Sequence, residues 1–136
     1  MGNALAAKRQ TVHPTRVLIV DDIAQIRKLL REFLEEEPEF VVCGEAVDGS
    51  DAIARARELK PDLIILDASM PVLNGIQAAP LLKKLRPSAL IILFTAHELM
   101  MRGLQATEMG VDAVVAKDRG MAALGESINT LLHTKL

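Results

Sequence analysis

Residues 61–75 read PDLIILDASMPVLNG and contain a short apolar run between two polar segments. The run Leu63–Leu66 is continuously apolar, which is typical of a strand buried on both faces of a parallel sheet. Pro61 precedes this run and Asp67 follows it directly. Apolar residues at helical spacing then predict a helix at about Gly75–Leu85. The stretch therefore predicts a strand and a helix joined by a polar loop.

The same alternation of apolar strand and amphipathic helix occurs four more times along the chain. The other strands are expected at Arg16–Val20, Phe40–Cys43, Ala89–Phe94 and Ala113–Ala116. The other helices are expected at about Ile23–Leu34, Ser50–Leu59, Glu98–Met109 and Met121–Leu132. Ser50 or Asp48 is the expected N-cap of the second helix, and Gly110 the C-cap of the fourth. Pro80, inside the third helix, predicts a local kink or a late start there.

Five strands alternating with five helices predict an α/β fold with a parallel sheet. Right-handed crossovers place helices on both faces of such a sheet. The common doubly wound order for five strands is 2-1-3-4-5, as in flavodoxin-like folds. We expect residues 15–136 to form this one domain, and residues 1–14 to form a flexible N-terminal tail in which His13-Pro14 stops any helix.

Composition limits the classes of protein to which the chain can belong. Half of its 136 residues are hydrophobic, and its formal net charge is −2. This balance gives no indication of a nucleic-acid-binding surface. The single cysteine, Cys43, lies in an apolar run and is expected to be a buried thiol. No stretch has the length of a membrane span or the pattern of a signal peptide, so we expect a cytoplasmic protein without membrane partners.

Polar residues follow four of the five expected strands at the point where each strand ends. Asp21 and Asp22 follow the first strand, Asp67 the third, Thr95 the fourth and Lys117 the fifth. In the order 2-1-3-4-5 these residues converge on one edge of the sheet, where ligands of open α/β sheets bind. Taken singly, each also fits a helix N-cap, a loop residue or a solvated charge. Taken together, three carboxylates at one place need a cation, and oxygen ligands suit Mg²⁺.

This set of residues also suggests a reaction. An aspartate can act as a nucleophile and form an aspartyl phosphate. Asp67 ends the central strand, between the acidic pair and Lys117. The metal and Lys117 would neutralise the charge of a transferred phosphoryl group, and the Thr95 hydroxyl would donate to one of its oxygens.

At these positions the chain resembles the receiver domains of two-component response regulators, over roughly residues 15–134. The matching motifs are the acidic pair Asp21-Asp22, the segment 67–75 with its Met-Pro and Gly, Thr95-Ala96, and Lys117. The resemblance implies a chemotaxis-type receiver fold and a histidine kinase as the phosphoryl donor. It also implies that the chain catalyses only its own phosphorylation and dephosphorylation in phosphorelay signalling.

The resemblance further implies a role for each matching position. Asp67 is the expected phosphorylation site. Asp22, Asp67 and the backbone carbonyl of Ser69 are the expected direct ligands of Mg²⁺, with Asp21 contributing through water. Thr95 is the expected switch hydroxyl, and Lys117 the expected partner of the phosphoryl group.

Two positions depart from the family pattern. Val114 stands where receivers usually carry a Tyr or Phe that moves inward on activation, and Asp118 stands where a Pro usually follows the lysine. The usual coupling to the surface formed by the fourth helix, the fifth strand and the fifth helix is therefore in question. Ser69 and His97 occupy positions that tune dephosphorylation in the family.

Several alternatives stay open at this point. A phosphatase or phosphomutase also uses an aspartate nucleophile, but it typically has an acid two residues later, where this chain has Ser69. A receiver that binds partners without phosphorylation is a second alternative, supported by Val114. The output surface is expected at the fourth helix with Met100 and Met101, and at the fifth strand. A homodimer can form through the surface of the fourth helix, the fifth strand and the fifth helix. A DNA-binding output domain in a longer parent protein is a further alternative, since this domain is not expected to bind nucleic acid itself.

Overall fold

The structure is a computed structural model that describes residues 13–96 and 109–134. Within these ranges five parallel strands form one sheet in the order β2-β1-β3-β4-β5, which confirms the predicted α/β doubly wound fold. The strands are β1 (Thr15–Val20), β2 (Phe40–Ala46), β3 (Leu63–Leu66), β4 (Leu90–Thr95) and β5 (Ala113–Ala116). The helices are α2 (Ala24–Glu35), α3 (Gly49–Leu59), α4 (Gly75–Leu85) and α6 (Gly120–Thr134), with a 3-10 turn, η1, at Lys117–Arg119.

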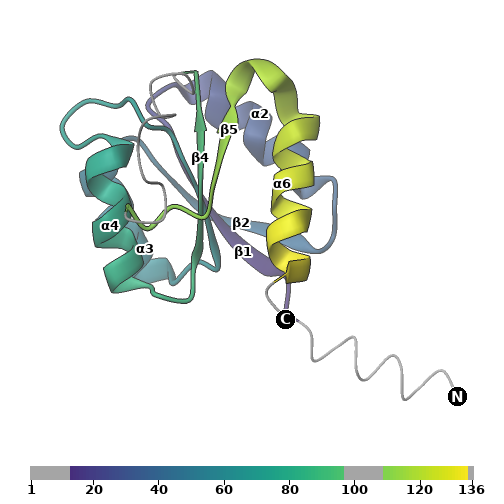
Figure 1. Ribbon diagram of the computed structural model, residues 1–136, viewed down its shortest axis with the longest axis horizontal. Helices are drawn as coiled ribbons and strands as arrows, with labels where there is room; N and C mark the ends of the chain where they lie inside the picture. The colour runs from purple at the N-terminus through teal and green to yellow at the C-terminus, as the bar shows by residue number, and fades with distance from the viewer. Residues whose placement is uncertain (1–12, 97–108, 135–136) are drawn as a thin grey trace, which may run out of the picture.

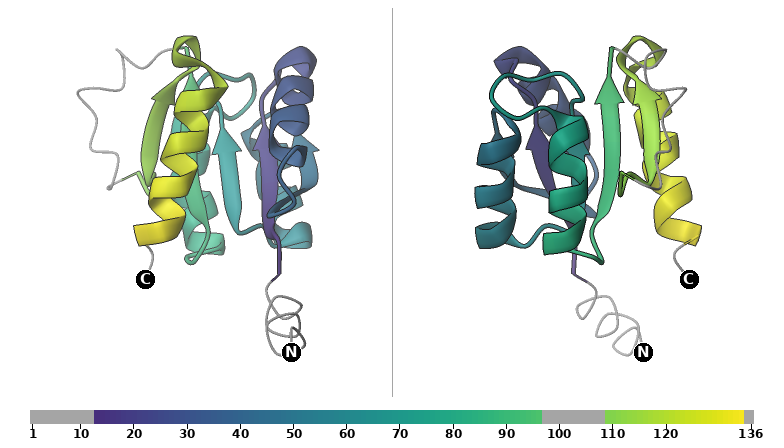
Figure 2. Two further views of the ribbon diagram at one scale, coloured as in Figure 1. Left: turned by 90° about the vertical axis from the view of Figure 1, so that its right-hand side faces the viewer. Right: turned by 60° about the vertical axis from the view of Figure 1, so that its left-hand side comes forward.

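The helices cover the sheet from both sides (Figures 1 and 2). Helices α3 and α4 pack on one face, and α2 and α6 pack on the other. Successive residues of a strand point to opposite faces, so each strand serves both layers. In β3, Ile64 and Leu66 belong to the first layer, whereas Leu63 and Ile65 belong to the second. All four are fully buried, as the continuous apolar run predicts.

Strand β2 runs to Ala46, so its predicted end at Cys43 is wrong. The pairing with β1 shifts between Val17 and Leu18, where Val17 lies opposite Val42 but Leu18 lies opposite Gly44. Cys43 is the extra residue of this bulge, and its thiol donates to the carbonyl oxygen of Val17 at 3.4 Å. Glycine and glutamate are poor strand formers, so the sequence pattern ended before the strand does.

Helix starts depend on local capping. Asn74 caps α4 through a capping box with Gln77, and the helix starts at Gly75 as predicted, so Pro80 causes no late start. Asp48, one of the two expected candidates, caps α3 by accepting from the Asp51 amide at 2.8 Å. Helix α6 begins at Gly120, directly after η1, one residue before its predicted start.

Three expectations fall wholly or largely outside the described residues. They concern the tail at 1–12, the helix at about 98–109, and the surface with Met100 and Met101. Gly110, the expected cap of that helix, is described and has a positive φ of 80°. Within 13–96 and 109–134, no helix has both the length and the apolar character needed to cross a membrane.

Candidate functional site

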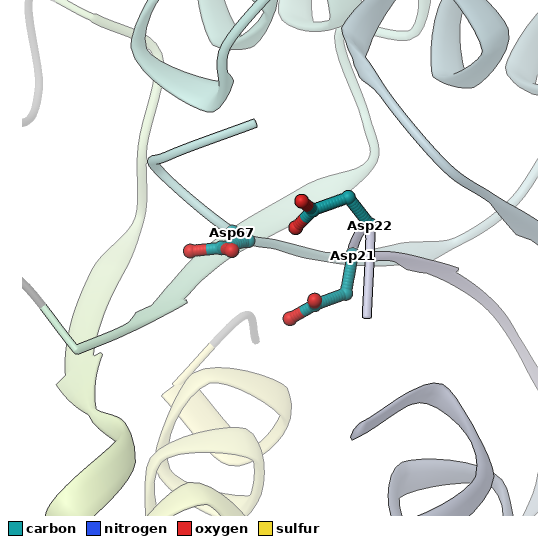
Figure 3. Close-up of side chains that lie close together, drawn as sticks. All are labelled: Asp21, Asp22 and Asp67. Atoms are coloured by element: carbon teal, nitrogen blue, oxygen red, sulfur yellow. The ribbon is translucent and has the colours of Figure 1, made fainter. Parts of the chain in front are cut away.

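The carboxyl ends of β1 and β3 bring three aspartates together. Val20 of β1 lies opposite Leu66 of β3, so the residues that follow, Asp21 and Asp67, leave the sheet side by side. Figure 3 shows the side chains of Asp21, Asp22 and Asp67 next to one another. One carboxylate oxygen of each lies within 4.8 Å of the others. Asp21 and Asp67 are buried, with 1% and 5% of their surface exposed, whereas Asp22 is exposed.

Lys117 contacts two of these carboxylates and follows β5, an edge strand that lies on the other side of β3 from β1. Its ammonium donates to Oδ2 of Asp21 at 2.7 Å. The same nitrogen lies 3.4 Å from Oδ2 of Asp67. The Lys117 side chain is itself only 17% exposed, so this ion pair lies largely out of solvent. One ammonium faces three carboxylates, and the cluster therefore carries excess negative charge when all are ionised.

Burial raises the pKa of Asp67 above its ordinary value. The nearby ammonium of Lys117 opposes this increase in the pKa, and the negative charge of Asp21 adds to it. An ionised Asp67 is therefore held at a cost in free energy that a further cation would remove. The donors are carboxylate oxygens, two of them on buried residues, and such a set fits a hard divalent cation such as Mg²⁺.

Backbone groups fix the orientation of Asp21 and Asp67. Oδ1 of Asp21 accepts from the amide of Ile23 at 2.9 Å, and the Asp21 amide donates to the carbonyl of Ala46 at 3.1 Å. Oδ1 of Asp67 accepts from the amide of Ser69 at 3.3 Å. Ser69 thus contacts the Asp67 carboxylate through its N–H group, while its expected role as a carbonyl ligand stays a prediction.

Thr95 lies at the same edge of the sheet, although as the last residue of β4 rather than the first residue after it. It is fully buried and pairs with Ala116, the residue before Lys117. The expected metal ligands and the residues expected to contact the phosphoryl group are therefore all described, and each lies at the carboxyl end of its strand or just beyond it. His97 lies outside the described residues. Val114 is half-buried in β5 against the α3 and α4 side of the core.

The loop after Asp67 brings Gly75 close to the backbone of Asp67 and Ala68. The amide of Gly75 donates to the carbonyl of Ala68 at 3.1 Å. A Cβ atom at Gly75 would overlap the carbonyl oxygen of Asp67 and lie 2.8 Å from its carbonyl carbon. Glycine is therefore required here by contact with the backbone of Asp67.

Sequence reasoning missed Arg27, whose Nη1 donates to the carbonyl oxygen of Asp21 at 2.7 Å. Its place on the charged side of the first predicted helix indicated a solvated residue. Only the pairing of β1 with β2, together with the packing of α2 against these strands, shows that this arginine reaches the acidic pair.

Residues 17–129 match the family model described as the response regulator receiver domain. A protein-glutamate methylesterase/protein-glutamine glutaminase of Maricaulis maris is 38% identical over 97% of this chain, which covers 34% of that protein. The next two curated relatives bear the same description, and the chain spans about a third of the length of all three.

Solved structures give the same result. A two-component response regulator of the LuxR family from Aurantimonas has a TM-score of 0.81 at 30% identity, covering 89% of this chain and 86% of that one. The response regulator domain of Thermotoga maritima CheB has a TM-score of 0.73 at 31% identity, covering 90% of this chain and 95% of that one.

Proposed function

The chain belongs to the response regulator receiver domain family, which acts in two-component phosphorelay signalling, and on this basis we propose that Asp67 is its phosphoryl acceptor. The observation that carries the proposal is the ammonium of Lys117, which lies between the buried carboxylates of Asp21 and Asp67. The proposed donor is a phosphohistidine of a histidine kinase, and we propose that the reaction takes place in the cytoplasm. We propose that the receiver domain comprises residues 15–136 and that residues 1–14 precede it.

Each side chain of the site has a separate role in the proposed phosphoryl transfer. A carboxylate oxygen of Asp67 attacks phosphorus, the bond from phosphorus to the donor nitrogen breaks, and an acyl phosphate forms. Lys117, 3.4 Å from Oδ2 of Asp67, neutralises an oxygen of the incoming group. The Ser69 amide holds Oδ1 of Asp67, and the Thr95 hydroxyl donates to a phosphoryl oxygen. Burial of Asp67 limits the access of water to the product.

We also propose that the acidic cluster holds Mg²⁺. Asp22, Asp67 and the carbonyl of Ser69 would be direct ligands, and Asp21 would act through water. When bound, the ion supplies positive charge to the phosphoryl oxygens and to the carboxylates that would otherwise repel them. The support lies in the excess of carboxylate over ammonium at a largely buried place.

The chain itself is proposed to turn over no substrate besides its own phosphoaspartate. Its relatives are described as methylesterases or LuxR-family regulators, and the match covers only about a third of the former. We propose that the output lies in a separate partner or in a further domain, which in LuxR-like proteins would bind DNA. The surface that reports phosphorylation would include β5 and α6, through which a homodimer can form.

The experiment that tests this function is phosphorylation by a small acyl phosphate with and without Mg²⁺. The expected result is Mg²⁺-dependent labelling of the wild type and none of Asp67→Ala, read by intact mass. The Asp67→Ala chain must retain its circular dichroism spectrum for the comparison to count. Labelling that persists in Asp67→Ala contradicts the assignment, and steady hydrolysis of a phosphate ester by the wild type indicates an enzyme instead. Size-exclusion chromatography of both forms then shows whether phosphorylation changes the oligomeric state.

A further inference from the structure

Two arginines of α2 form ion pairs with one glutamate of β2 next to the acidic cluster. Arg27 and Arg31 lie one helical turn apart and both reach Glu45. Nε of Arg27 donates to Oε1 of Glu45 at 2.9 Å, and Nε of Arg31 donates to Oε2 at 2.8 Å. Both oxygens of Glu45 are therefore engaged, and the carboxylate has little freedom to rotate.

A second nitrogen of Arg27 contacts the backbone of the acidic pair. Its Nη1 donates to the carbonyl oxygen of Asp21 at 2.7 Å, while its Nε stays on Glu45. This carbonyl belongs to the peptide that joins Asp21 to Asp22. The orientation of that peptide sets the direction in which the Asp22 side chain leaves the backbone. The Asp21 amide, on the other side of the residue, already donates to Ala46.

The contact differs from an ordinary surface ion pair. The side chain of Arg27 is only 17% exposed, and that of Glu45 is 30% exposed. The two arginines hold the pKa of Glu45 below its ordinary range even though burial alone would raise it. Arg27 reaches the carboxylate and the carbonyl from two different nitrogens of one rigid, planar guanidinium, whereas a lysine would have a single nitrogen on a flexible stem for both acceptors.

We propose that Arg27, oriented by Glu45, is a positioning residue that holds the Asp21–Asp22 peptide in the geometry that binds the divalent cation. This inference rests on the proposed function, since it assigns to Arg27 the arrangement of the ligands of that site. It adds to the site a link between β1, β2 and α2 that lies outside the reacting atoms. Partners that orient metal ligands typically change metal affinity by about 10- to 100-fold when removed.

Positioning and simple electrostatics predict opposite results for the loss of Arg27. Removal of a cation near three carboxylates makes the local potential more negative, which favours Mg²⁺ binding. Loss of the bond to the Asp21 carbonyl disorders the ligands, which weakens Mg²⁺ binding. The direction of the change therefore separates the two explanations.

The test is a Mg²⁺ titration of the full chain, followed by the backbone amide resonances of residues 21–23 in NMR. The chain contains no Trp or Tyr, so fluorescence quenching by the metal offers no convenient readout. Arg27→Met is expected to raise the Kd for Mg²⁺ by about tenfold or more. Arg27→Lys keeps the positive charge but not the planar guanidinium, and it is also expected to raise the Kd for Mg²⁺. Glu45→Gln is expected to raise the Kd by a smaller factor.

Arg31→Met is the matched control, because it removes a guanidinium from Glu45 but leaves both bonds of Arg27. Its Kd for Mg²⁺ is expected to stay within about twofold of the wild type, since surface ion pairs contribute little. The phosphorylation rate of Arg27→Met should be low at limiting Mg²⁺ and recover at saturating Mg²⁺. A mere loss of folded protein would instead lower the rate at every Mg²⁺ concentration.

The outcomes separate this inference from the function on which it rests. An unchanged or lower Kd in both Arg27→Lys and Glu45→Gln, the two mildest changes, overturns the positioning role. A wild-type chain that binds Mg²⁺ but takes up no phosphoryl group overturns the proposed function and leaves the positioning role in place. A wild-type chain that binds no Mg²⁺ overturns both.

Discussion

Replacement of Gly75 by alanine should slow phosphorylation of Asp67 without any change in a charged or polar side chain. A Cβ at this position would lie 2.8 Å from the carbonyl carbon of Asp67 and 2.9 Å from Cα of Ala68. Ordinary van der Waals contact begins at 3.4 Å, so these atoms must recede by about half an ångström, and the Asp67 carbonyl oxygen by more. All three are backbone atoms and have no rotamer with which to relieve the overlap. The start of α4 and the acceptor must therefore move apart.

The substitution Gly75→Ala is expected to lower both the free energy of unfolding and the rate of phosphorylation. Insertion of a methyl group into a closely packed region destabilises a protein by about 1–3 kcal/mol. A displacement on the order of 1 Å of a reacting group can lower a rate by about 100-fold. Urea unfolding followed by circular dichroism measures the first effect. The initial rate of labelling by a small acyl phosphate at saturating Mg²⁺ measures the second.

A matched control is Gly125→Ala in the middle of α6. There the new Cβ would meet only the end of the Phe33 side chain, at 3.1 Å, and alanine favours the helix by about 1 kcal/mol. Gly125→Ala should therefore keep the wild-type labelling rate. If Gly75→Ala also labels within about twofold of the wild type, the close approach does not position the acceptor and the reasoning is wrong.

Three further changes test the site and the fold around it. Asp67→Asn should abolish labelling and stabilise the metal-free domain at neutral pH. The sign follows from the raised pKa of Asp67, because its contribution to stability is present at low pH and is lost as the pH rises through that pKa. Denaturation of both proteins across pH 3–8 should show the difference vanish in acid, and a constant difference contradicts it. Lys117→Met should slow labelling by about 100-fold or more yet tighten Mg²⁺ binding, since it removes a competing cation, and calorimetric titration should show this. Asn74→Ala should destabilise the domain by about 1 kcal/mol through loss of the α4 capping box, as urea unfolding should show.

The alternation of strands and helices and the place of the site could be predicted because both depend on local patterns, and the strand order was taken from the common doubly wound arrangement of five strands. Apolar runs such as Leu63–Leu66 mark strands buried on both faces, and a polar residue directly after such a run lies at the edge where ligands bind. This reasoning needs no knowledge of side-chain contacts. The sequence pattern therefore predicts that Asp21, Asp67 and Lys117 lie together.

Contacts that depend on register could not be predicted in the same way. The bulge at Cys43 shifts Glu45 into line with Ile19, and this shift lets the Glu45 carboxylate meet Arg27. A one-residue difference in β2 pairing would turn that side chain to the opposite face of the sheet. The close approach of Gly75 to Asp67 likewise depends on how the loop returns, which no local propensity encodes.

The two contacts of Lys117 also predict how the proposed phosphorylation would be transmitted in a chain with valine at position 114. The ammonium lies 2.7 Å from Asp21 but 3.4 Å from Asp67. A phosphoryl group gives its site a charge of about −1.5 to −2, which should draw the ammonium away from Asp21 and toward Asp67. Lys117 begins η1, which leads directly into α6, so the movement acts on this connection through the backbone.

A valine side chain is too short to replace the swing of an aromatic ring, so this backbone route should dominate. Amide resonances of residues 117–121 should therefore shift more on phosphorylation than that of Val114 itself. The same comparison in Lys117→Met loaded with beryllofluoride should lose the shift at 118–121, because the ammonium that moves the turn is gone. A larger shift at Val114 than in the turn, in the wild-type chain, would place the signal in the strand and refute the backbone route.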